Sequence, residues 1–250
     1  MLLGRCHLCQ KKFSCPDDAQ EPFPRCPRDN GEIVIFPFGE PEWLAARSPE
    51  AMLLYLLGKA SARKLRLLSC AVCRRIGHLL TDPRSRQVVD VAEQYADNFV
   101  GEAELTAALH GATAAVEDAG NDWAAANPAD SVRLVSRRYD TEPYDPIHLA
   151  EAVAKVLGDR AGDFGEGERH AQGKLIQEVF GNPFRPNAAP ASWPQVVIDL
   201  AQALYDDKGD RHILADAVEE AGHQELAEHF RAEEWHPKGC WVMDVILGKG

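Results

Sequence analysis

The sequence predicts a mainly α-helical protein with a small β-containing segment at its N-terminus. Its composition, 45% hydrophobic and 26% charged over 250 residues, is that of an ordinary globular protein. After Gly39, alanine- and leucine-rich sequence with helical periodicity begins. The first forty residues differ from the rest, because they hold four of the seven cysteines. These observations predict two domains, residues 1–39 and residues 40–250.

The N-terminal domain is expected to contain a strand. The run "EIVIF", residues 32–36, is rich in β-branched residues and shows no helical periodicity. Five prolines in the same forty residues also disfavour a helix there.

Repeated start signals predict the helices of the second domain. Ser48, Asp82 and Asp145 each stand directly before a proline, and Ser61 is a further N-cap candidate. In the segment after Ser61, leucine, valine and isoleucine recur at helical spacing and form one apolar stripe. We therefore expect helices over residues 49–58, 62–80, 83–100, 102–119, 146–157, 169–180, 194–206, 211–221 and 223–232. The proline-rich segment 181–194 is expected to pack across the helices through Phe184 and Trp193.

The net charge of −12 is unevenly distributed along the chain. Between Gly58 and Arg86, eight basic residues are accompanied by a single acidic residue, Asp82. The acidic remainder of the chain disfavours non-specific binding of nucleic acid. We expect the basic side chains to pair with acidic side chains of the same chain rather than with an acidic partner. The eight residues are Lys59, Arg63, Lys64, Arg66, Arg74, Arg75, Arg84 and Arg86.

The sequence predicts a cytoplasmic protein. No apolar run approaches the roughly 18 residues of a membrane-spanning helix, and the opening "MLLGRC" is too short for a signal peptide. Seven cysteines that include two C-x2-C pairs favour metal ligands or free thiols in a reducing compartment over disulfides.

The N-terminal cysteines have the spacing of a zinc site. Cys6 and Cys9 form one C-x2-C pair, and Cys26 begins a second pair in which Asp29 occupies the place of the fourth cysteine. Four such ligands would bind Zn²⁺ as a closed, structural tetrahedral site. Either Asp29 or Cys15 could be the fourth ligand, and Cys15 is preferred because thiolate binds zinc better than carboxylate.

Residues 4–36 resemble the short bacterial zinc ribbons, which carry C-x2-C, an aromatic residue and then C-P-x-C-G. The segment departs from that pattern at Asp29. The resemblance implies a zinc-ribbon-like β cap. The alternative is a degenerate ribbon with free thiols, whose fold depends on Phe13, Phe23 and Phe36.

The remainder of the chain, residues 41–249, is similar to an uncharacterised bacterial helical family. The segments "FGNPFRP", "ILADAVEEAG" and "GCWVMDVILGK" carry this resemblance. It implies a helical fold, and it transfers no activity and no catalytic residues.

A second group of cysteines lies in the helical domain. Cys70 and Cys73 are spaced to share one helix face, and His236 and Cys240 lie four residues apart near the C-terminus. Together they could form a second tetrahedral metal site. The preferred interpretation is that these cysteines are small buried hydrophobic residues.

The C-terminal run "CWVMDVILG" is too apolar to stay in solvent, so we expect it to pack on the helical body with Trp241 in the core. Asp244 interrupts the run and would be costly to bury without a partner. The nearest cations in the sequence pattern are those of the basic segment. We expect Asp244 to lie near one of the arginines of this segment, with Arg74 and Arg75 favoured.

No catalytic motif is present in the sequence, which favours a non-enzymatic, zinc-binding adaptor or regulatory module that binds a protein partner. One alternative is a nucleic-acid-binding protein that uses the zinc ribbon and the basic segment 58–86. The other is an enzyme whose site is assembled from residues scattered through the sequence. Salt-dependent retention of nucleic acid would separate the first two functions.

Overall fold

The computed structural model describes residues 2–6, 12–15, 33–56, 58–120, 130, 152–153, 166–185, 190, 192–232 and 234–249. In the three N-terminal strands it gives the course of the backbone. Within these residues no helix is both long and apolar enough to cross a membrane.

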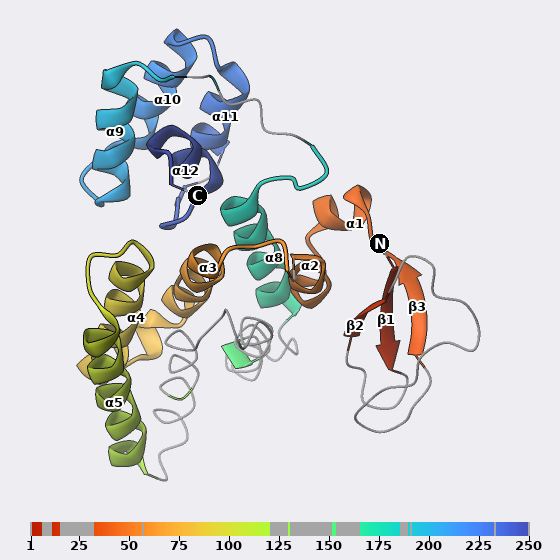
Figure 1. Ribbon diagram of the computed structural model, residues 1–250, viewed down its shortest axis with the longest axis vertical. Helices are drawn as coiled ribbons and strands as arrows, with labels where there is room; N and C mark the ends of the chain where they lie inside the picture. Colours follow the sequence, from red (N-terminus) through yellow and green to blue (C-terminus); the bar gives the residue numbers. More distant parts are fainter. Residues whose placement is uncertain are drawn as a thin grey trace.

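The described part of the chain is mainly α-helical, as the sequence predicts (Figure 1). The first group of helices is α1 (Glu40–Ala45), α2 (Pro49–Leu56), α3 (Ala62–Arg75), the 3-10 helix η1 (Gly77–Leu79), α4 (Pro83–Ala96), α5 (Glu102–Ala119) and α8 (Glu166–Phe180). The second group is α9 (Gln195–Tyr205), α10 (Arg211–Glu220), α11 (Gln224–Ala232) and α12 (Trp241–Leu247).

The predicted start signals act as helix caps. The hydroxyl of Ser61 accepts a hydrogen bond from the backbone N–H of Lys64 at 3.3 Å, and a carboxylate oxygen of Asp82 accepts one from the N–H of Arg84 at 2.8 Å. The helix expected over 62–80 ends earlier, at Arg75, and continues as η1. The helix expected over 146–157 lies almost entirely outside the described residues.

The N-terminal strands form an antiparallel sheet in the order β2-β1-β3. The strands are β1 (Leu2–Cys6), β2 (Lys12–Cys15) and β3 (Ile33–Pro37), so the predicted "EIVIF" strand is displaced by one residue. Cys15 pairs with Leu2, at the opposite end of β1 from Cys6. Cys9, Cys26 and Asp29 lie outside the described residues, so the ribbon itself stays a prediction.

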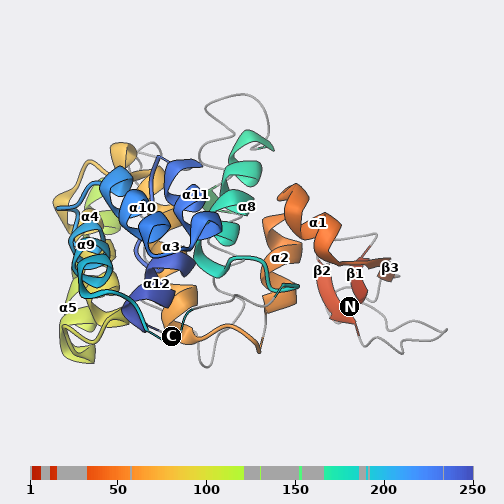
Figure 2. The same cartoon turned by 90° about the horizontal axis from the view of Figure 1, so that it is seen from above.

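The helices bury two separate hydrophobic cores, one in each group. The first core is formed by α1 to α5 and α8, and the second by α9 to α12. In Figure 1 the second group lies above α3 and α8, with α12 next to them, and Figure 2, seen from above, shows this group over α3. We call the first group the body and residues 192–249 the C-terminal unit.

The segment between α8 and α9 packs as expected through its aromatic residues. Phe184 stacks on Tyr55 of the body with ring centroids 4.8 Å apart. Trp193 packs against the second core, and its ring contacts His223 at 4.7 Å. The two aromatics therefore hold the ends of the segment on different cores.

The basic segment is paired inside the protein, as expected. Arg74 bonds Asp90 and Glu93, and Arg75 bonds Glu168. The remaining six basic side chains also contact groups of the same chain, through ion pairs, backbone carbonyls or aromatic rings: Lys59, Arg63, Lys64, Arg66, Arg84 and Arg86.

A close approach of α8 to the end of α1 gives a test of the packing. A Cβ atom added at Gly173 would overlap the backbone carbonyl of Ala46, whereas one added at Gly111 in α5 would meet only side-chain carbons of Arg84 at 3.8 and 3.9 Å. We expect Gly173→Ala to destabilise the protein by about 1–3 kcal/mol through overpacking. We expect the control Gly111→Ala to stabilise it by up to about 1 kcal/mol, because alanine favours a helix. Urea unfolding measures both, and equal effects of the two changes would contradict the packing.

Candidate metal centre

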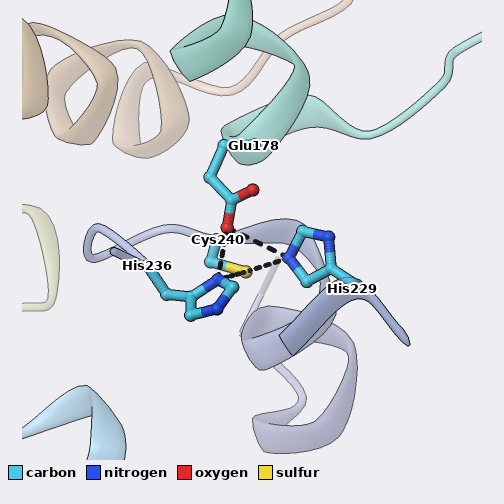
Figure 3. Close-up of side chains that lie close together, drawn as sticks. All are labelled: Glu178, His229, His236 and Cys240. Atoms are coloured by element: carbon cyan, nitrogen blue, oxygen red, sulfur yellow. Dashed lines mark hydrogen bonds and ion pairs between the residues drawn. The ribbon is translucent and has the colours of Figure 1, made fainter. Parts of the chain in front are cut away.

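Four side chains that can ligate a metal converge where the C-terminal unit meets the body (Figure 3). Glu178 extends from the last turn of α8. His229 lies in α11, His236 in the connection that follows it, and Cys240 is the N-cap residue of α12. Their ligating atoms all lie within 4.8 Å of one another.

The individual distances show that the four groups point at one centre. Oε1 of Glu178 lies 2.7 Å from Nδ1 of His236 and 3.0 Å from Nε2 of His229. Sγ of Cys240 lies 3.2 Å from Nε2 of His229 and 4.0 Å from Nδ1 of His236. The same two ring nitrogens therefore face both the carboxylate and the thiol, as Figure 3 shows with dashed lines.

The cluster is enclosed by protein. Cys240 and the side chain of His236 are fully buried, and the side chains of Glu178 and His229 are mostly buried. The ring of Phe230 contacts both histidine rings edge-on, and Trp241 contacts His229 at 5.6 Å. A pocket of about 270 Å³ is lined in part by Glu178 and His229.

The two histidines lower the pKa of Glu178. Burial alone would raise the pKa of this carboxyl, but hydrogen bonds and charge from His229 and His236 outweigh it and lower the pKa to about 2. Burial raises the pKa of Cys240 well above its ordinary value, and the nearby Glu178 adds to the shift. With protein groups alone, Glu178 is ionised and Cys240 stays a thiol.

A cation satisfies this arrangement better than protons do. Nε2 of His229 carries at most one hydrogen, which cannot point at both Glu178 and Cys240. Tetrahedral zinc, with bonds of about 2.0–2.3 Å, has ligand–ligand distances of about 3.3–3.8 Å, so these four atoms would fit after shifts of about 1 Å or less. The cluster could therefore hold a metal ion.

Two of the four residues considered from the sequence as a second metal site belong to this cluster. His236 and Cys240 lie in it, but Cys70 and Cys73 do not. Those two thiols are fully buried in the first core, where burial raises the pKa of both. Their interpretation as small hydrophobic residues is the one that the structure supports.

Sequence reasoning missed His229 and Glu178. The sequence signal for His229 is the spacing H-x6-H-x3-C, in which three donors fall within twelve residues. Glu178 has no sequence signal, because only the packing of α8 against the C-terminal unit brings it to the cluster.

Beside this cluster, Asp244 joins the C-terminal unit to α3. Its carboxylate bonds Arg63 at 2.8 Å and Lys64 at 2.6 Å. Asp244 thus pairs with the basic segment, as expected, but the expectation of Arg74 or Arg75 is wrong. Those two arginines lie at the other end of α3 and pair within the body.

The C-terminal run packs on the protein as expected. Val242, Met243 and Ile246 are buried in the second core, where Trp241 is only half-buried. Trp241 therefore lies at the edge of that core rather than inside it, contrary to the expectation.

The likeness to zinc ribbons and to a bacterial helical family stays an expectation. Comparisons with family models, with curated proteins and with solved structures found no match to this chain.

Proposed function

We propose that this protein is a non-enzymatic zinc-binding adaptor whose buried metal centre is structural. The observation that carries the proposal is the convergence of Glu178, His229, His236 and Cys240 on one enclosed point. Four protein ligands complete a tetrahedral site, whereas a catalytic zinc keeps one position open for water or substrate.

The donor set favours zinc among the metals. A thiolate and two imidazoles are poor ligands for Mg²⁺ and Ca²⁺, which prefer oxygen. Thiolate, imidazole and carboxylate are all ordinary ligands of Zn²⁺. Metal binding would deprotonate Cys240 and thereby replace a buried thiol with a paired thiolate.

The main alternative chemistry is a Cys–His–Glu hydrolytic site, and two features oppose it. In such a site the carboxylate orients the histidine through the ring nitrogen that does not face the nucleophile. Here Glu178 and Cys240 both contact Nε2 of His229. Cys240 is also fully buried with a raised pKa, which is the opposite of an activated thiolate.

A protein partner is favoured over nucleic acid by the state of the basic segment. Its side chains are engaged within the chain, and the net charge is −12. Binding to nucleic acid that weakens steeply with salt would favour the alternative function instead.

Metal analysis tests the proposed centre. We expect protein purified without chelators to contain zinc, and Cys240→Ser to lose one equivalent per chain, as measured by mass spectrometry of the metal content. Cys73→Ser is the matched control and should keep the wild-type content, because Cys73 is buried far from the cluster in the first core.

A second variant in the same assay distinguishes zinc bound by the predicted N-terminal ribbon from zinc bound by the buried centre. Zinc lost on replacing Cys6 and Cys9 with serine, but kept in Cys240→Ser, belongs to the ribbon. A wild-type protein without metal, or a Cys240→Ser variant with wild-type content, would refute the buried centre.

A further inference from the structure

We propose that the metal ion clamps the C-terminal unit, residues 192–249, onto the helical body, so that metal occupancy controls whether the two parts stay docked. This inference rests on the proposed metal centre and extends it from a local site to a joint between two parts of the fold.

The division of the ligands carries the inference. Three donors come from one short stretch of the C-terminal unit, between His229 and Cys240. The fourth, Glu178, comes from α8 of the body. In Figure 3 Glu178 approaches the other three from the opposite side of the centre. Without Glu178 the unit would hold a metal with one position open, so docking completes the coordination.

The rest of the junction is largely polar, and its apolar contacts are Leu67 of α3 against Gly239 and the Trp241 ring against Gly181 among the described residues. Arg63, Lys64 and Asp97 of the body meet Tyr205, Asp244 and Lys249 of the C-terminal unit. The hydroxyl of Tyr205 donates to Asp97 at 2.6 Å, and Lys249 lies 3.3 Å from the same carboxylate. The two hydrophobic cores remain separate on either side of this junction.

A polar junction of this kind does not hold two domains rigidly by itself. Relative motion is the expected behaviour where no large hydrophobic interface joins two units. The attraction within buried ion pairs is largely offset by the cost of removing the charges from water. A metal ion bound from both sides supplies the directional bonds that the ion pairs lack.

Lys64 reports on docking directly. Its amino group contacts three segments at once: the carbonyl of Val179 in α8 at 2.9 Å, the carbonyl of Gly239 at 2.8 Å and the carboxylate of Asp244 at 2.6 Å. Two of these partners belong to the C-terminal unit, and the Lys64 side chain is only 15% exposed. Undocking would therefore free an amine that the docked protein shields. Lys174, which is exposed on α8, provides an internal reference.

The experiment measures acetylation of these two lysines in the full-length protein by peptide mass spectrometry. In zinc-loaded wild type we expect Lys64 to react much more slowly than Lys174. After chelation, the rate at Lys64 should rise toward the rate at Lys174, while circular dichroism stays helical because both cores remain folded.

Glu178→Ala separates the clamp from metal binding itself. The variant should bind zinc through the three remaining donors. Loss of a group that only hydrogen-bonds a ligand lowers metal affinity by about tenfold or more, so loss of the ligand Glu178 itself should lower the zinc affinity at least about tenfold. Lys64 should then be acetylated as fast as in chelated wild type, even at saturating zinc. Glu168→Ala is the matched control, because Glu168 lies on the same helix, is equally buried at 7% and pairs with Arg75 of the body. It should keep the zinc-dependent protection of Lys64.

The outcomes distinguish the two proposals. If the protein binds no zinc, the metal centre fails and the clamp fails with it. If zinc binds but Lys64 stays protected after chelation and in Glu178→Ala, the clamp is wrong and the metal centre stands. If Glu178→Ala loses its helical signal, Glu178→Gln takes its place, because the amide keeps the shape of the side chain and lacks the charged ligand oxygen.

Discussion

Replacing Asp244 with alanine should lower the free energy of unfolding by about 3–5 kcal/mol, the cost of breaking a buried ion pair. Asp244 is 3% exposed and bonds both Arg63 and Lys64. Burial would lower the pKa of Arg63, but the hydrogen bond and charge of Asp244 outweigh it and keep the pKa raised. Removing Asp244 leaves three cations at the junction, Arg63, Lys64 and Lys249, and among the described residues there Asp97 is the remaining carboxylate.

The control for this change is Asp90→Ala. Asp90 also pairs with an arginine of α3, Arg74, but it is 51% exposed. An exposed pair contributes about 0–1 kcal/mol, so this variant should unfold close to the wild-type urea concentration. If Asp244→Ala costs no more than Asp90→Ala, the junction does not depend on its buried charges.

Replacing Trp43 with alanine should cost about 3–5 kcal/mol, as expected for a large aromatic side chain removed from a core. Trp43 in α1 is fully buried and contacts the rings of Tyr55 and Phe184. Its indole N–H donates to the carbonyl of Gly181 at 3.0 Å, at the end of α8. The variant would lose the apolar burial and also leave that carbonyl without its donor.

Phe99→Ala is the corresponding control, since Phe99 is 72% exposed after α4. Surface changes of this kind usually alter stability by less than about 0.5 kcal/mol. Thermal and urea unfolding measure both variants. Similar losses in the two would mean that α1 and the segment after α8 are not part of the first core.

The helices that the sequence predicts are those with local signals. A cap residue and an apolar stripe lie within one helix, as with Ser61 and the stripe of α3, so neither depends on the rest of the fold. Helix α1 was missed because it has six residues and its N-cap residue is Gly39, whose N–H donates to the carboxylate of Glu42. Helix α12 was missed because it is apolar on nearly all sides and shows no helical period.

The metal centre and the junction could be predicted only in part, because their partners are brought together by tertiary packing. His236 and Cys240 are close in sequence and were weighed as ligands of one site, whereas Glu178 is distant from them along the chain. For Asp244 the charge pattern of the sequence identified the basic segment as its partner but not Arg63 within that segment. Arg63 and Arg74 are separated by about 16 Å along α3, and the approach of α12 decides between them.

The division of the ligands between α8 and the C-terminal unit also has a consequence for the unfolded chain. Glu178 and His229 lie about 50 residues apart, so a metal held by both closes a loop of that length; the same closure by a disulfide removes entropy equivalent to about 4 kcal/mol. The donors from His229 to Cys240 close only a short loop, so most of this entropic effect comes through the single carboxylate of α8. In these terms the ion of the proposed centre would be a reversible cross-link, present only when metal is available and removed without cutting any covalent bond.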